Sequence, residues 1–138
     1  MDRYLGVKIL DAEPMNLGRY NILRGWQIPE NEDPTREGYR VVYSDGYVSW
    51  SPKEIFKEAY RRIDDLTFGL AVEVMKKGHK VARKGWNGKG MWVVMVKARD
   101  FEFSELSPHF VIKNVRNSFD TWVPSIVDTL AEDWEVVE

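Results

Sequence analysis

The sequence predicts an α+β protein in which small antiparallel sheets pack with short helices in two compact units. An Asp45-Gly46 dipeptide between two apolar runs is typical of a tight β-hairpin. A run that starts at Thr67 has the apolar spacing of an amphipathic helix. With 138 residues, 43% of them hydrophobic, the chain can bury the core of one ordinary domain or of two very small ones.

The first elements predicted along the chain are a strand and a short helix. Apolar and polar residues alternate from Tyr4 to Leu10, which predicts the strand. Asn16 can cap the helix that follows, and Gly25 can end it.

The hairpin is the strongest local prediction. The runs GYRVVY and YVSW flank Asp45-Gly46, where glycine supplies the positive φ of the turn. Directly afterwards, Ser51-Pro52-Lys53-Glu54 combines an N-cap serine, a proline at the first helical position and a glutamate three residues on. This pattern predicts a helix that runs to about Ile63.

A second group of elements follows the charged run RRIDD. Thr67 can cap a helix that Gly78 closes, with apolar residues at helical spacing. The later elements predicted are strands at His79–Lys84, Met91–Ala98 and His109–Val115, a turn at Asn117-Ser118, a helix over Pro124–Ala131 and a strand over Trp134–Val137. We therefore divide the chain into an N-terminal α+β accessory module, residues 1–63, and a C-terminal domain, residues 66–138.

One predicted strand is apolar on both of its faces. Trp92, Val94 and Val96 lie on the face that a single covering helix would leave open. Because two such small units leave apolar surface uncovered, we expect the chain to assemble as a homo-oligomer.

The cellular compartment of the protein is predicted from features that the sequence lacks. It contains no cysteine, which excludes disulfides and thiolate metal sites, and it shows neither a secretion leader nor a run of apolar residues that could cross a bilayer. We expect a cytoplasmic protein with no membrane partner.

The charge distribution favours a small anionic ligand over a nucleic-acid polymer. The net charge is −2, whereas proteins that bind phosphate backbones usually carry a basic excess. The segment from Val74 to Arg99 nevertheless contains no acid. Its eight cations are Lys76, Lys77, Lys80, Arg83, Lys84, Lys89, Lys97 and Arg99. Such a block is either a solvated face or a local positive field for a small phosphate.

The sequence offers no recognisable catalytic or metal-binding arrangement. Its two histidines, His79 and His109, have no serine or carboxylate at a catalytic spacing, and no phosphate-loop or zinc motif is present. We therefore expect a non-enzymatic protein with no catalytic residue, no metal and no cofactor.

Aromatic residues are the more informative group. Trp86 and Trp122 stand in glycine- or proline-flanked segments, where ligand contacts concentrate. Stacking of a base on such a ring contributes roughly 1–3 kcal/mol. The alternative is that both tryptophans close the hydrophobic core. Arg83, Lys84 and Lys89 lie near the first of these loops, and could hold a phosphate.

A short segment near the C-terminus has two compatible interpretations. Ser125 and Asp128 stand three residues apart, which first of all predicts a capping box. The same residues, next to Trp122, can also present a hydroxyl and amides to a ribose or a phosphate.

Two stretches together resemble one known family. The residues LTFGLAVEVMKKGHKVARKGWNGKGMWVVMV and, later, WVPSIVDTLAEDWEVV are similar to the Thoeris anti-defence two family of bacteriophage proteins over Leu66 to Glu138. The combination of the TFG helix start, the ARKGWNGKGM loop and the terminal PSxxDxLAEDW is more specific than any part of it.

The resemblance implies that residues 66–138 form a nucleotide-signal-binding anti-defence domain that acts in the infected bacterial cell. Family members sequester glycocyclic ADP-ribose made by TIR-domain enzymes without degrading it, and some also hold cyclic dinucleotides at a separate site. They assemble as homotetramers with pockets between protomers. The loop composition and the resemblance together predict these ligand-binding residues: Phe68, Arg83, Lys84, Trp86, Asn87, Lys89, Trp122, Ser125 and Asp128.

The chain departs from the family pattern in two places. The stretch from Ala98 to Asp120 carries an added RDFEFSEL segment and lacks an expected glycine turn. The first 65 residues are extra and resemble a module of other phage and prophage proteins. Two alternative functions remain open: contact with a host protein, and binding of single-stranded nucleic acid, which the acidic remainder of the chain disfavours.

Overall fold

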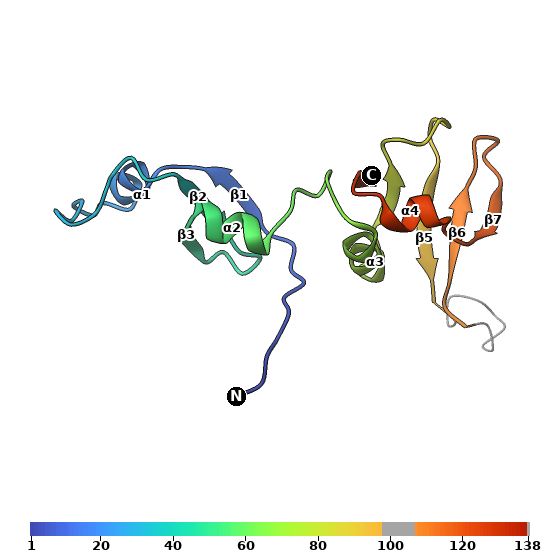
Figure 1. Ribbon diagram of the computed structural model, residues 1–138, viewed down its shortest axis with the longest axis horizontal. Coiled ribbons are helices and arrows are strands. Elements are labelled where there is room, and N and C mark those ends of the chain that lie inside the picture. The colour runs from blue at the N-terminus through green and yellow to red at the C-terminus, as the bar shows by residue number, and fades with distance from the viewer. Residues whose placement is uncertain (98–106, 138) are drawn as a thin grey trace. The chain divides into compact units, whose positions relative to one another are not determined.

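The protein is described by a computed structural model that covers residues 1–97 and 107–137 (Figure 1). The predicted α+β class is confirmed, because the chain forms two antiparallel sheets with short helices. It divides into two compact units, Met1–Tyr60 and Arg61–Glu138. No helix among the described residues is long and apolar enough to cross a membrane.

The N-terminal unit is a three-stranded sheet of order β1-β2-β3 with two short helices. Its buried residues include Met15, Tyr20 and Val41, and the indole N–H of Trp50 donates to the Met15 carbonyl at 2.7 Å. The elements are β1 (Asp11–Pro14), α1 (Leu17–Leu23), β2 (Gly38–Val42), β3 (Val48–Pro52) and α2 (Lys53–Ala59).

Two turn predictions in this unit are confirmed. The hairpin joins β2 to β3, and Gly46 adopts the expected positive φ of 89°. The Asn16 side chain accepts a hydrogen bond from the Arg19 amide at the start of α1, and Gly25, with a φ of 73°, follows the end of that helix.

The predicted strand from Tyr4 to Leu10 is wrong, because no regular element forms before Asp11. The antiparallel register pairs Asp11 with Val42, which is the last residue of β2. Residues before Asp11 therefore have no β2 residue opposite them to complete a ladder of hydrogen bonds.

The predicted helix start at Ser51 is also wrong. Ser51 and Pro52 belong to β3, where they pair with Tyr39 and Gly38, so α2 begins at Lys53 without a side-chain cap. The helix ends at Ala59 rather than near Ile63. Here the hydrogen bonds of the sheet prevail over the local capping pattern.

The C-terminal unit is a five-stranded antiparallel sheet of order β7-β6-β5-β4-β8 with two helices. Thr67 caps the first helix as predicted, because its side chain accepts a hydrogen bond from the Leu70 amide. The elements are α3 (Phe68–Lys76), β4 (Lys80–Arg83), β5 (Trp92–Val96), β6 (His109–Lys113), β7 (Phe119–Trp122), α4 (Ile126–Leu130) and β8 (Trp134–Val137).

The core of this unit lies between α3 and one face of the sheet. Met75 on α3 is 1% exposed, and Val81 and Val93 on β4 and β5 are fully buried. Trp134 at the start of β8 is also fully buried. Complete burial of a side chain of this size stabilises the fold by roughly 3 kcal/mol or more, so Trp134 anchors the unit.

Two details differ from the sequence prediction, and one predicted feature lies outside the described residues. The strand β7 was not predicted, although the turn before it was, and Asn117 has the positive φ of 62° that the turn requires. The helix predicted over Pro124–Ala131 is shorter, since Ser125 is its N-cap and Ala131 is already extended. The added segment RDFEFSEL lies at residues 99–106, outside the described residues.

Candidate ligand-binding site

Four aromatic side chains from four parts of the C-terminal unit pack against one another. We call this group, Phe68, Trp86, Trp122 and Trp134, the aromatic cluster. Ring centroids lie 5.3 Å apart for the pair Trp86 and Trp134, and 6.1 Å apart for the pair Trp86 and Trp122, with edge-on geometry. The fold thus brings together the three aromatic residues predicted for the site and adds Trp134. Phe110 of β6 also packs against Phe68 and Trp122, with ring centroids 6.2 and 5.8 Å away.

Trp86 is held by packing and by one hydrogen bond. Its ring is half-buried against the hydrophobic core, and its indole N–H donates to Asp128 Oδ1 at 3.1 Å. Phe68 and Trp122 are likewise half-buried against the core. The interpretation that these rings close the core is therefore supported, and only part of each ring remains for contact with a ligand.

Arg83 lies at the end of β4 and is neutralised within the fold. Its guanidinium donates to Asp133 Oδ1 at 2.8 Å and to Asp128 Oδ1 at 3.0 Å. The Arg83 side chain is only 15% exposed, so these two ion pairs are well shielded from water. Its hydrogen bond with Asp133 is the main cause of a raised Arg83 pKa.

Asp128 connects the helix cap to the ion pairs. The predicted capping box is confirmed: the Asp128 amide donates to Ser125 Oγ at 3.0 Å, and the Ser125 amide donates to Asp128 Oδ2 at 3.3 Å. Burial acts to raise the pKa of Asp128, but hydrogen bonds from Trp86, Arg83 and Ser125 outweigh it and lower that pKa.

Asp133 is a site residue that the sequence analysis missed. It accepts hydrogen bonds from Arg83 and, at 2.8 Å, from the Gly85 amide at the start of the loop. The Arg83 guanidinium is the main cause of the lowered pKa of this carboxyl. The antiparallel pairing of β4 with β8 sets Arg83 opposite Trp134, next to Asp133. That register is not visible in the sequence.

The side chains of the remaining predicted residues lie outside this network, although the Lys84 backbone amide donates to the Asp133 carbonyl at 3.1 Å. Lys84, Asn87 and Lys89 are exposed on the loop between β4 and β5, next to the half-buried Trp86. The fold therefore divides the predicted site into two sets. Phe68, Arg83, Trp86, Trp122, Ser125 and Asp128 form a framework whose polar groups are mutual partners, and Lys84, Asn87 and Lys89 are exposed donors beside it.

The basic block does not form one uniform positive surface. Arg83 is neutralised by its two aspartates, Lys76 pairs with Glu73, and the Lys80 ammonium lies 4.7 Å from the centre of the Trp92 ring. Arg99 lies outside the described residues. The charges on the loop, Lys84 and Lys89, are those placed best for an anion near Trp86.

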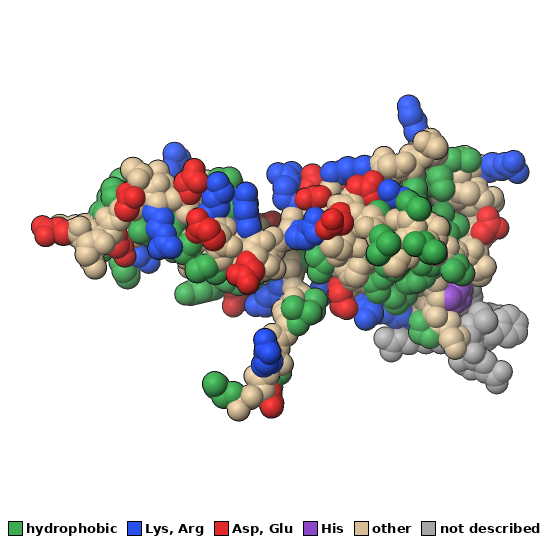
Figure 2. All heavy atoms as spheres, in the orientation of Figure 1, with side chains coloured by type: hydrophobic (Ala, Val, Ile, Leu, Met, Phe, Trp, Pro, Cys, Tyr) green, Lys and Arg blue, Asp and Glu red, His purple; other side chains and the backbone are tan. Residues whose placement is uncertain are grey.

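An exposed apolar surface lies beside the aromatic cluster. We call it the α4 patch. It consists of Val123, Ile126, Val127 and Leu130, which are 85%, 79%, 68% and 74% exposed. Figure 2 shows hydrophobic side chains gathered over α4. Contiguous apolar surface of this kind usually marks a contact with another molecule.

The described part of the chain contains no group of three or more His, Cys, Asp or Glu side chains that could hold a metal ion. The side chains available at the site are partly exposed rings, ammonium groups and an amide. Such groups suit a ligand that has both a flat ring and negative charge.

Comparisons with known proteins match the C-terminal unit. Residues 66–137 match the model of the Thoeris anti-defense 2-like domain. The chain is also 42% identical over 85 residues to Thoeris anti-defense 2 of Bacillus phage SP01, an alignment that covers 52% of this chain and 94% of that protein.

Proposed function

This chain belongs to the Thoeris anti-defense 2-like family, and we propose that it is a phage anti-defence protein that binds and sequesters a cyclic nucleotide immune signal. The proposed ligand is glycocyclic ADP-ribose made by TIR-domain enzymes, with cyclic dinucleotides as possible further ligands. Sequestration keeps the defence effector inactive without any chemical change in the signal.

The observation that carries the proposal is that the region matched to the family contains both the aromatic cluster and the loop with Lys84, Asn87 and Lys89. The exposed part of the Trp86 ring can stack on an adenine base. The two lysines and the Asn87 amide can then hold the phosphates and riboses. Asp133, which pairs with Arg83, also accepts a hydrogen bond from the Gly85 amide and so fixes the start of the loop, which lowers the entropic cost of binding.

A non-catalytic mode of action is part of the proposal and is directly testable. The purified protein is incubated with glycocyclic ADP-ribose, separated from free ligand and denatured by heat, and the released molecule is analysed by mass spectrometry. We expect the intact signal in an amount stoichiometric with the protein. Recovery of a cleaved product would instead identify an enzyme, and recovery of no nucleotide would contradict binding.

The role of the exposed loop is tested without disturbing the core. We expect Lys89→Ala and Asn87→Ala each to weaken signal binding about tenfold, because each removes a donor that is free to contact the ligand. Titration calorimetry measures the change. The matched control is Lys77→Ala, which removes an exposed charge of the same basic block at the end of α3. Equal losses in the control and in the loop variants would show that only general charge matters.

Assembly as a homotetramer also belongs to the proposal. The α4 patch supports self-association, because four exposed apolar side chains on one short segment are costly in water. We expect Leu130→Glu to lower the oligomeric state measured by sedimentation velocity, whereas Arg116→Glu in the exposed β6–β7 turn leaves it unchanged. An unaltered oligomer in Leu130→Glu would assign the α4 patch to another partner.

A second candidate function is contact with a host protein, and the α4 patch is the observation that favours it. The two candidates differ in one outcome. Loss of anti-defence activity in Leu130→Glu with full signal binding and an unchanged oligomer would support the host contact.

A further inference from the structure

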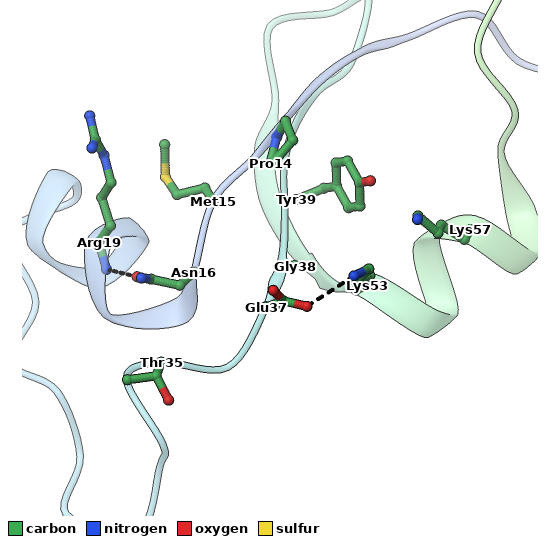
Figure 3. Close-up of a pocket in the computed structure, with 10 residues that line it drawn as sticks. All are labelled: Pro14, Met15, Asn16, Arg19, Thr35, Glu37, Gly38, Tyr39, Lys53 and Lys57. Carbon is green, nitrogen blue, oxygen red and sulfur yellow. Dashed lines mark hydrogen bonds and ion pairs between the residues drawn. The ribbon is translucent and has the colours of Figure 1, made fainter.

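The N-terminal unit contains an open surface pocket of about 560 Å³, called the cavity below, that lies outside the region matched to the family (Figure 3). Four parts of the unit line it: the start of α1, the segment before β2 with Thr35 and Glu37, the sheet and the first turns of α2. This volume falls within the range of about 300–1,000 Å³ that small-molecule sites occupy. The polar lining residues are Asn16, Arg19, Thr35, Glu37, Lys53 and Lys57.

Positive charge is concentrated at this cavity although the unit as a whole is acidic. Residues 1–60 carry ten Asp and Glu against eight Lys and Arg. The cavity lining reverses that ratio, with three cations, Arg19, Lys53 and Lys57, and one carboxylate, Glu37. A general solvated surface would follow the composition of the unit, so this local excess is a property of the cavity.

Two of the three cations, Arg19 and Lys57, form no ion pair with a carboxylate among the described residues. The hydrogen bond from Lys53 is the main cause of the lowered pKa of Glu37, and Lys57 adds to this effect only through its charge. Lys53 pairs with Glu37 at 3.0 Å, so these two charges neutralise each other. No ion pair involves Arg19 or Lys57 in the described part of the chain. Figure 3 shows Arg19 on one side of the Gly38–Tyr39 segment and Lys57 on the other, so the two free charges flank the cavity.

The rest of the lining suits an organic molecule rather than a bare ion. Pro14, Met15 and the ring of Tyr39 contribute apolar surface. The Tyr39 ring is fixed by stacking on Phe56, with centroids 4.2 Å apart. The cavity therefore combines a rigid apolar wall with two flanking positive charges.

From this arrangement we propose that the N-terminal unit is a second binding site, which takes a small phosphorylated molecule with two or more negative charges. The Arg19 guanidinium offers paired donors that match phosphate oxygens, and Lys57 adds a point charge. The polar lining is completed by the Thr35 hydroxyl, which donates to Asp33 Oδ1 at 2.6 Å, and by the Asn16 side chain, which caps α1. This site is separate from the aromatic cluster, so it is independent of the function proposed for the C-terminal unit.

The test uses nuclear magnetic resonance of the isotope-labelled full-length chain, which reports where each probe binds. The probes are ADP and pyrophosphate, with uncharged adenosine and succinate for comparison. We expect ADP and pyrophosphate to shift the backbone signals of Thr35, Tyr39 and Lys57, and adenosine and succinate to leave them unchanged. Shifts confined to residues 61–137, or shifts as large with adenosine or succinate, would overturn the proposal.

Charge variants then test the individual residues. Arg19→Ala and Lys57→Ala should each weaken ADP binding at these signals about tenfold, since each removes an unpaired cation. The matched control is Arg3→Ala, which removes one exposed charge from the same unit away from the cavity and should leave binding unchanged. Binding that is equal in all three variants would overturn the assignment.

A gain of affinity gives an independent check. Glu37→Gln removes the only carboxylate of the lining and frees Lys53, so ADP should bind about fivefold more tightly. Unchanged or weaker binding in Glu37→Gln, with a spectrum otherwise like that of the native protein, would contradict an electrostatic site.

Discussion

Asp128 is the residue at which the helix cap, an ion pair and an indole hydrogen bond meet. One of its carboxylate oxygens serves both Arg83 and Trp86, and the other accepts from the Ser125 amide. Its side chain is only 14% exposed. A carboxylate that satisfies three donors in a shielded position is hard to replace, because its removal leaves each of them without this partner.

The first prediction concerns this carboxylate. We expect Asp128→Ala to lower the free energy of unfolding of the C-terminal unit by about 2–4 kcal/mol, since it removes the cap and one partner of a shielded ion pair. Urea denaturation followed by tryptophan fluorescence measures the change. The nearby Glu132→Ala, whose carboxylate is 66% exposed, should change stability little. Similar losses in both variants would show that the network contributes no more than a surface pair.

The second prediction concerns the loss of folding stability at acidic pH. The pKa values of Asp128 and Asp133 lie below the ordinary value of 3.8, so the unfolded chain takes up these protons at a higher pH than the folded protein. Their stabilising contribution is therefore fully present above about pH 5 and is lost as the pH falls below about 4 and through the lowered pKa values.

Urea midpoints measured from pH 6 to pH 2.5 test this dependence. We expect the urea midpoint of Asp133→Asn to fall less steeply as the pH decreases, because one of the two carboxyls no longer titrates. Asp2→Asn, at an exposed position of the N-terminal segment, should show the same fall of the urea midpoint with pH as the native protein. If the urea midpoint of Asp133→Asn falls as steeply with decreasing pH as that of the native protein, the loss of stability in acid comes from other groups.

At the residue scale, local spacing predicts contacts within one turn and misses contacts across the sheet. The Ser125–Asp128 box follows from a separation of three residues and is confirmed. The contact of Arg83 with Asp133 spans fifty positions and depends on the β4–β8 register, which no local pattern encodes. The roles of Lys84, Asn87 and Lys89 toward a ligand stay predictions.

At the element scale, the boundary between β3 and α2 shows how tertiary contacts override a capping pattern. The sequence Ser51-Pro52 suits a helix start, yet both residues pair with β2. Sheet pairing wins here because the adjoining strands, the Asp45-Gly46 turn and the packing of Trp50 all fix the same register. The elements with strong local caps, α1 and α3, were predicted with both of their ends.

The third prediction concerns the close contact between β2 and β3. A methyl group at Gly38 would overlap the Trp50 ring and the Ser51 carbonyl. We expect Gly38→Ala to destabilise the N-terminal unit by about 2 kcal/mol or more, because neither a strand backbone nor a packed indole can easily move. Thermal unfolding followed by the nuclear magnetic resonance signal of the Trp50 indole N–H tests this prediction. Gly6→Ala, where a methyl group meets nothing within 4 Å, is the control and should leave the melting temperature unchanged.

At the scale of the whole molecule, each unit has its own core. The N-terminal core is small and centres on Met15, Tyr20 and Val41, while the C-terminal core is larger and centres on Trp134. The sequence analysis placed a division at the RRIDD run, and the boundary between the two compact units of the structure falls between Tyr60 and Arg61. A 60-residue unit buries a smaller fraction of its surface than a larger one and is therefore less stable.

The fourth prediction follows from these separate cores. We expect a chain of residues 61–138 to fold by itself and to bind the immune signal with the affinity of the full-length protein. Circular dichroism and calorimetry of the truncated chain measure both properties. An unfolded truncated chain would show that the first sixty residues supply part of the C-terminal core, and a folded chain that fails to bind would assign them a part in signal recognition.

The aromatic cluster also has an optical consequence. Trp86, Trp122 and Trp134 lie with ring centroids 5.3–6.1 Å apart and ring planes 71–78° apart, so their electronic transitions are close enough to couple. Indoles this close exchange excitation energy, and we expect a paired positive and negative band in ultraviolet circular dichroism. This coupled spectrum belongs to the C-terminal unit and disappears when its packing loosens. The protein thus carries an intrinsic spectroscopic reporter of its proposed signal-binding unit.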